Sequence, residues 1–117
     1  MLMMGFPRRL CQPGELVTVE TAPEIPVYLE GFVLPAGLSD LFHQIDEVQV
    51  GETKLGPLVL AFQPDNPRAA YATPMELVRV RAGEAVKCTL ASMASMGYAP
   101  AMLRLAAIVR ADGEVRR

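Results

Sequence analysis

Residues 78–90 read VRVRAGEAVKCTL, and apolar side chains alternate there with charged or polar ones on both sides of Ala82-Gly83-Glu84. A period of two places successive side chains on opposite faces of a strand. Two such runs joined by a short segment that contains glycine are typical of a hairpin. The stretch therefore predicts a β-hairpin with one apolar face directed inward and a basic outer face.

The rest of the chain is divided by ten prolines and nine glycines, and long helices do not form between such residues. The segments that remain are short and rich in Val, Leu and Ile, which indicates antiparallel strands. The expected strands are Leu16–Glu20, Val27–Leu34, Ile45–Val50, Leu58–Phe62, Met75–Arg81, Ala85–Ser92 and Met102–Arg110. We predict an all-β fold, an antiparallel β-sandwich of about seven or eight strands.

Two segments also fit a helical period. Apolar residues recur from residue 38 to 45 at i, i+3, i+4 and i+7, and Ser39 can cap the turn before them. We therefore expect a short helix near 38–45. Residues 102–109 allow both periods, but the β-branched pair Ile108 and Val109, and the need of the preceding hairpin for a neighbouring strand, favour a strand there.

The length of 117 residues is in the range of one domain. We expect an N-terminal arm at 1–14, a β-sandwich domain at 15–112 and a C-terminal tail at 113–117. Residues 1–53 contain 8 acidic and 2 basic residues, and residues 54–117 contain 5 acidic and 9 basic ones. Poles of opposite charge allow head-to-tail pairing of subunits, although two complementary sheets inside one subunit would give the same count.

Few residues suit catalysis or metal binding. On a helical turn His43, the only histidine, would share a face with Asp40 and Glu47, but no second histidine or paired cysteine accompanies them. Cys11 and Cys88 are far apart and form no C-x-x-C motif. Nucleophile-elbow glycines and a glycine-rich phosphate loop are also missing from the sequence. We predict a protein that is not an enzyme and has no cofactor and no metal.

Basic residues on neighbouring predicted strands raise the question of nucleic-acid binding. These residues are Arg79, Arg81, Lys87, Arg104 and Arg110. Aromatic residues, which would stack on bases, are missing from these strands. Salt bridges to Glu76 and Glu84 are the ordinary alternative, so nucleic acid is not an expected partner. The longest uncharged stretch, Cys88 to Leu103, is too short to cross a bilayer as a helix, and we expect no membrane span.

Two apolar segments are suited to contact with another chain. Hydrophobic residues make up 51% of the sequence, which is high for a small monomer. The N-terminal arm is more apolar than a solvated tail, and the loop near residues 92–98 combines adaptable methionines with a tyrosine. For that loop, folding back over the core is an equal alternative. The expected interface residues are Leu2, Met3, Met4, Phe6, Arg8, Arg9, Met93, Met96 and Tyr98.

The order of segments resembles that of small single-jelly-roll structural proteins of tailless icosahedral bacteriophages. The resemblance covers residues 24–111. Its residues are IPVYLEGFVLP at 25–35, IDEVQVG at 45–51, AVKCTLAS at 85–92 and AAIV at 106–109. In that family a strand that ends in a proline step precedes a strand with an aspartate, a valine and a closing glycine, and two closing strands follow.

The resemblance implies a non-enzymatic virion structural protein, a capsid or capsid-associated jelly-roll subunit. Such a subunit assembles in the host cytoplasm by binding copies of itself and other virion structural proteins. Two alternatives remain open at this point. One is a monomeric cellular β-sandwich that serves as an adaptor or ligand-binding module, and the other is a small enzyme or metal protein built around His43.

Overall fold

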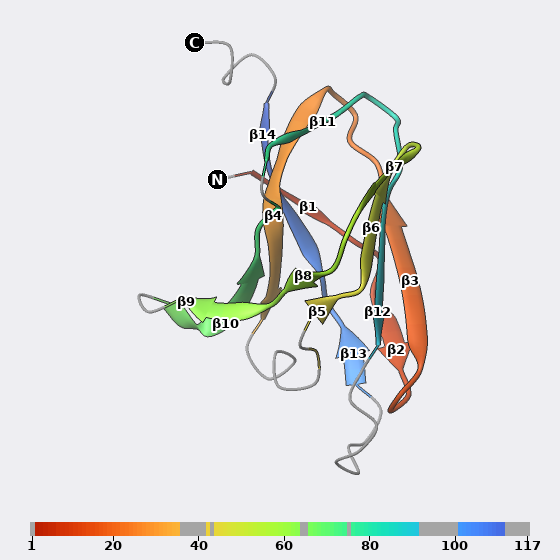
Figure 1. Cartoon of the computed structure of the whole chain (residues 1–117), viewed down its shortest axis with the longest axis vertical. Helices are drawn as coiled ribbons and strands as arrows, with labels where there is room; N and C mark the ends of the chain where they lie inside the picture. Colours follow the sequence, from red (N-terminus) through yellow and green to blue (C-terminus); the bar gives the residue numbers. More distant parts are fainter. Residues whose placement is uncertain are drawn as a thin grey trace.

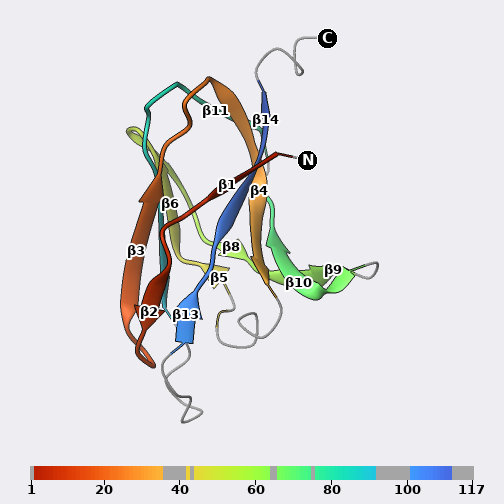
Figure 2. The same cartoon turned by 180° about the vertical axis from the view of Figure 1, so that it is seen from behind.

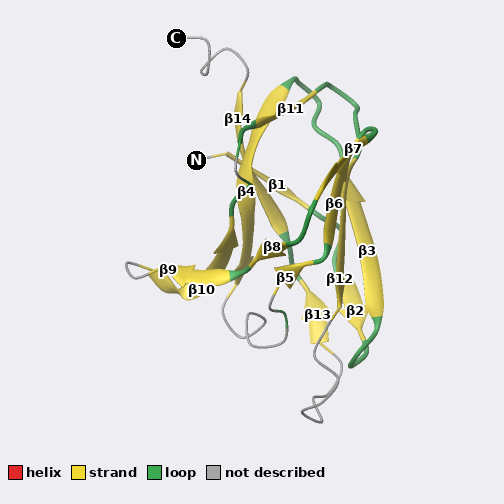
Figure 3. Cartoon of the chain, viewed as in Figure 1, coloured by secondary structure: helices red, strands yellow, loops and turns green. Residues whose placement is uncertain are grey.

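The computed structural model of the chain describes residues 2–35, 42, 44–63, 66–74, 76–91 and 101–111. These residues form strands and loops, and none of them is helical (Figure 3). The strands are β1 (Leu2–Gly5), β2 (Arg9–Cys11), β3 (Leu16–Thr21), β4 (Val27–Pro35), β5 (Gln44–Ile45), β6 (Glu47–Val50), β7 (Thr53–Leu55), β8 (Leu58–Val59), β9 (Ala61–Gln63), β10 (Asn66–Ala72), β11 (Val78–Val80), β12 (Val86–Ala91), β13 (Ala101–Leu103) and β14 (Ala106–Ala111). The prediction of an all-β fold is confirmed for the described residues.

Most strands belong to two antiparallel sheets that face each other (Figures 1 and 2). The larger sheet has the order β1-β14-β4-β10-β9, and β11 also pairs with β4. The smaller sheet has the order β3-β12-β6-β7. Two short ladders, β2 with β13 and β5 with β8, complete the pairing. The first and last described strands are thus hydrogen-bonded neighbours in the larger sheet.

The core lies between the two sheets, and strand periodicity decides which residues fill it. In β12, for example, Val86, Cys88 and Leu90 are buried while Lys87 is exposed. Full burial of a large aliphatic or aromatic side chain contributes about 1.5–3 kcal/mol. The largest fully buried side chains are Phe32, Phe42, Leu29, Leu34, Ile45, Leu90 and Leu103.

A β-bulge in β4 allows residues on both sides of it to face the core. Leu29 and Phe32 are both buried, although residues three apart point to opposite faces of a regular strand. The register between β4 and β14 shifts at this point and leaves Glu30 as the extra residue. Its carboxylate forms an ion pair with Arg110 of β14. The bulge therefore turns the second half of β4 back toward the core and keeps the charged residue outside.

The hairpin expected over residues 78–90 is wrong, although both of its strands and its turn exist. β11 pairs with β4 in the larger sheet, whereas β12 pairs with β3 and β6 in the smaller one. Gly83 has a φ of 79°, and the amide of Glu84 donates a hydrogen bond to the carbonyl of Arg81 at 3.0 Å, as in a type II turn. The chain crosses between the sheets here, because alternation fixes the buried face of a strand and not its partner.

The expectation that residues 1–14 form an arm outside the sheets is also wrong. β1 pairs with β14, and β2 pairs with β13. Between them, Phe6 is only 7% exposed, and its amide donates to the carbonyl of Leu105 at 3.0 Å. Its ring packs against Phe32 with centroids 6.3 Å apart. These strands have four and three residues, which is too short for a recognisable alternation.

The short helix expected near residues 38–45 is not found where that segment is described. Gln44 and Ile45 form β5, which pairs with β8. Phe42 is 1% exposed and belongs to no helix or strand. Residues 36–41 and 43 lie outside the described residues. Phe42 and Ile45, which fit the helical spacing of apolar residues, are both buried in the core without forming a helix.

The other expected strands agree with the structure to different degrees. β3, β4 and β12 are found where the sequence places them, whereas the expected strand at 45–50 is divided into the end of β5 and β6. The expected strand at 58–62 is divided into β8 and β9, and the one at 102–110 into β13 and β14. β7 and β10 were not expected, and the sequence of β10, NPRAAYA, contains no β-branched residue. The expected tail at 113–117 lies outside the described residues.

Candidate functional site

The outer face of the smaller sheet is polar and satisfied by its own side chains. The hydroxyl groups of Thr18 and Thr89 are 3.1 Å apart across β3 and β12. Lys87 lies 4.0 Å from Glu20 on the same strand pair, and Lys54 of β7 lies 3.4 Å from Glu47 of β6. Such cross-strand pairs suit a surface in contact with water. Leu16 at the start of β3 is 63% exposed and is an apolar residue at the end of this otherwise polar face.

The outer face of the larger sheet carries the Glu30–Arg110 ion pair in one part and is apolar in another. One row of paired residues crosses four strands and consists of Gly5 in β1, Ala106 in β14, Val33 in β4 and Tyr71 in β10. Gly5 is exposed and the other three are half-buried. Their chain neighbours Ala107, Phe32 and Ala72 point inward and are buried. The row therefore faces away from the core and presents small and apolar side chains at the surface.

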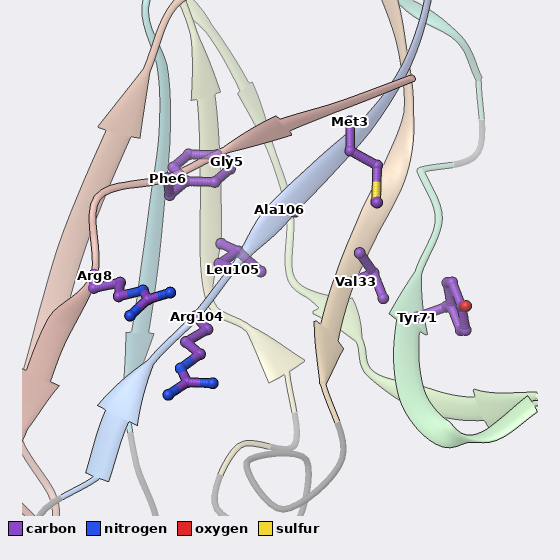
Figure 4. A pocket seen from close by; sticks show the side chains of 9 residues that line it. All are labelled: Met3, Gly5, Phe6, Arg8, Val33, Tyr71, Arg104, Leu105 and Ala106. Carbon is purple, nitrogen blue, oxygen red and sulfur yellow. The ribbon is translucent and has the colours of Figure 1, made fainter. Parts of the chain in front are cut away.

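A groove of about 440 Å³ lies along this row (Figure 4). Met3, which is 59% exposed, lines one side of it. Phe6 and Leu105 line its other end, where β1 and β14 leave the sheet (Figure 4). Gly5 and Ala106 have little or no side chain. The sheet surface is therefore hollow between Met3 on one side and Phe6 and Leu105 at the other end. Pockets that bind small molecules have volumes of roughly 300–1,000 Å³.

Two arginines stand at the Phe6–Leu105 end of the groove. Arg8 follows β1, and Arg104 lies between β13 and β14. Figure 4 shows both side chains on the side opposite to Met3, Val33 and Tyr71. Both arginines are exposed, and no carboxylate of the described residues forms an ion pair with either of them. Arg9, in contrast, lies 3.7 Å from Glu15. The groove thus joins an apolar floor to a positively charged end.

A second exposed apolar feature is the pair formed by Leu10 and Met102. These residues are directly opposite each other in the β2–β13 ladder. Leu10 is 52% exposed and Met102 is 40% exposed. β13 begins immediately after residues 92–100, which include the methionine-rich segment expected at an interface and lie outside the described residues. This pair is referred to below as the Leu10–Met102 pair.

The expected interface residues fall into three groups in the structure: exposed, packed in or against the core, and outside the described residues. Leu2 and Met3 are exposed, as are Arg8 and Arg9. Met4 packs against the core, and Phe6 is part of the core, with its 7% exposed surface at one end of the groove. The methionines at 93 and 96 and the tyrosine at 98 lie outside the described residues. Val33, Tyr71 and Ala106 were missed, because only the bulge and the strand register bring them to one outer face.

The other chemical candidates are dispersed. Arg79 belongs to the larger sheet and Lys87 to the smaller one, so the expected basic residues do not share one face. Asp40 and His43 lie outside the described residues, and the residues that are described contain no cluster of three potential metal ligands. Cys11 and Cys88 are free and buried. Burial raises the pKa of both thiols, with a smaller contribution from Glu15 at Cys11.

No helix in the described part of the chain is long and apolar enough to cross a membrane. No protein family model matches this chain, and neither a curated protein nor a solved structure matches it. Inferences about its function therefore rest on its own residues and their arrangement.

Proposed function

We propose that the chain is a virion structural protein, a capsid or capsid-associated jelly-roll subunit that does no chemistry and assembles with copies of itself and with other shell proteins in the host cytoplasm. The observation that carries this proposal is the order of strands in the two sheets. The Leu10–Met102 pair provides an exposed apolar contact for assembly.

A jelly roll can be described as a long antiparallel hairpin of eight strands that is rolled up. Before rolling, the first strand pairs with the eighth, the second with the seventh, the third with the sixth and the fourth with the fifth. Rolling then brings the eighth strand beside the third and the seventh beside the fourth. The two resulting sheets have the orders 1-8-3-6 and 2-7-4-5, so a jelly roll makes six specific pairings.

The pairings in this chain support such a roll. With β1, β3, β4, β6, β7, β10, β12 and β14 taken as strands one to eight, the hairpin pairs are β1-β14, β3-β12, β4-β10 and β6-β7. The two pairs that rolling adds are β14-β4 and β12-β6. Each of the six therefore has a counterpart in the chain. The remaining short strands extend or flank these eight.

The Leu10–Met102 pair is the contact that we assign to assembly. Large apolar side chains gain about 25 cal/mol for each Å² of surface removed from water, so an exposed pair on a rigid ladder is suited to an interface. The ladder lies at one end of the molecule, and β11 lies at the opposite end (Figures 1 and 2). Residues 92–100, which precede β13 in the sequence, include the methionines and the tyrosine expected at an interface.

The test is the mass of the chain in solution as a function of concentration. Analytical ultracentrifugation of the 12.7 kDa chain should show oligomers, and electron microscopy should show whether they close into shells. Leu10→Glu and Met102→Glu should lower the mass to that of the monomer. Leu77→Glu is the matched control, because Leu77 is 47% exposed and lies beside β11 at the far end. A wild-type chain that stays monomeric at every concentration would contradict the proposal.

The groove on the larger sheet favours a second candidate function. A monomeric cellular module that binds a small ligand or an adaptor partner would need a concave, mostly apolar site with a few polar groups. The groove between Met3 and Arg104 has this composition. The same mass measurement separates the two candidates, because this second function requires no assembly.

A further inference from the structure

We propose that the groove on the outer face of the larger sheet binds a single-chain fatty acid, with its acyl chain on the Gly5–Tyr71 row and its carboxylate at Arg8 and Arg104. This inference does not depend on assembly. It concerns the outer face of the larger sheet, whereas the proposed assembly contact is the Leu10–Met102 pair on a separate ladder.

The shape of the groove suits one narrow chain. Its floor is the row of Gly5, Ala106 and Val33, whose side chains are absent or short, and Met3 stands higher beside it. A polypeptide partner would meet a flat sheet more readily than a hollow of about 440 Å³. A flexible acyl chain can follow the row across the strands and remove both its own apolar surface and that of the floor from water.

The charge of the groove suits a carboxylate. Arg8 and Arg104 are both placed at one end, and the described residues supply no carboxylate to either. Guanidinium groups bind carboxylates through paired, charge-assisted hydrogen bonds. A neutral apolar ligand would leave both charges unused, and a cationic one would be repelled. A fatty acid matches both features, because its acyl chain is apolar and its carboxylate is negatively charged.

Gly5 provides a direct way to close the groove. A Cβ atom built on Gly5 has nothing within 4 Å, and Gly5 has no positive φ. Leucine at this position can therefore be accommodated by the fold, and its side chain occupies the hollow. Gly56 has the same open surroundings and lies outside the groove. Gly56→Leu is consequently a matched control for the addition of an exposed leucine.

The experiment is isothermal titration of the full chain with dodecanoate and with dodecanol, both below their aggregation concentrations. We expect one dodecanoate per chain and at least ten-fold weaker binding of dodecanol, which lacks the charge. Decanoate, which is two methylenes shorter, should bind about fifteen-fold more weakly than dodecanoate, since each buried methylene changes the affinity by about four-fold. Arg104→Gln and Arg8→Gln should each weaken dodecanoate binding by about ten-fold or more.

Gly5→Leu should abolish dodecanoate binding, and Gly56→Leu should bind as the wild type does. The arginine variants change exposed side chains, so they remain informative if Gly5→Leu does not fold, which circular dichroism would show. Equal affinity for dodecanoate and dodecanol, or unchanged binding by the arginine variants, would overturn the proposal. Loss of self-association in Gly5→Leu without any dodecanoate binding would also overturn it, and would identify the groove as a contact between copies. The mass of the wild-type chain tests the assembly proposal separately.

Discussion

Replacement of Phe6 by alanine tests whether the N-terminal residues belong to the core. Phe6 is 7% exposed, packs against Phe32 and lies between two short strands. Truncation of a buried phenylalanine to alanine costs about 3–5 kcal/mol. Because Phe6 lies at the margin of the core, we expect a loss near the lower limit, about 3 kcal/mol, in the free energy of unfolding.

This loss is large compared with the total stability of about 5–15 kcal/mol that is usual for a domain. The assay is urea denaturation followed by circular dichroism, at a concentration where the chain is monomeric. Small proteins have slopes of about 1–3 kcal/mol per molar urea, so the midpoint should fall by about 1–3 M. The slope itself should stay the same if the native state keeps its compactness.

Met3→Ala is the control, because Met3 belongs to the same N-terminal segment but is 59% exposed. Its effect should stay within about 0.5 kcal/mol, as is usual for surface substitutions. If Phe6→Ala changed the free energy of unfolding by less than about 1 kcal/mol, the segment would be a loosely attached arm. The assignment of β1 and β2 to the fold would then be refuted.

Two further predictions concern packing and ionisation. Gly31→Ala should lower the free energy of unfolding by about 1–3 kcal/mol, because a Cβ at Gly31 would lie 2.7 Å from the carbonyl oxygen of Ala72. Gly5→Ala is the control and should change the free energy of unfolding by less than about 0.5 kcal/mol. Equal effects of the two substitutions in urea titrations would contradict this prediction. Since burial raises the pKa of Cys88 above its usual value of 9.0, the unfolded chain loses this proton first as the pH rises. The free energy of unfolding should then fall by about 1.4 kcal/mol per pH unit above pH 9. Cys88→Ala should remove this contribution to the pH dependence. The same pH dependence in the wild type and in Cys88→Ala would contradict the prediction.

The sequence was sufficient for the class of fold and for most buried faces, because both depend on local periodicity. Val86, Cys88 and Leu90 are buried as their alternation predicts. Periodicity carries no information about partners, so alternation alone predicts a hairpin at the link between β11 and β12, where the chain crosses between sheets. The bulge at Glu30 could not be predicted from the sequence of β4, since it is a property of the pairing between β4 and β14.

The candidate site was predicted only in part, for a related reason. Met3 and Arg8 were expected to contact another chain; the structure places both along the groove, and their contact with another chain stays a prediction. Val33 and Tyr71 come from strands on the other side of β14, and the bulge decides that Val33 points outward. Phe6 was expected on an arm outside the sheets, because a short apolar segment fits an arm and an edge strand equally well.

The pairing of β1 with β14 affects how the chain folds during synthesis. Leu2–Gly5 emerges from the ribosome about a hundred residues before Ala106–Ala111, its hydrogen-bonding partner. Until about a hundred further residues have been translated, the apolar first strand has no native neighbour, and contacts between such distant segments form slowly. Nascent chains will therefore expose the apolar first strand until β14 has been translated, and chaperones that shield it should raise the yield of soluble protein.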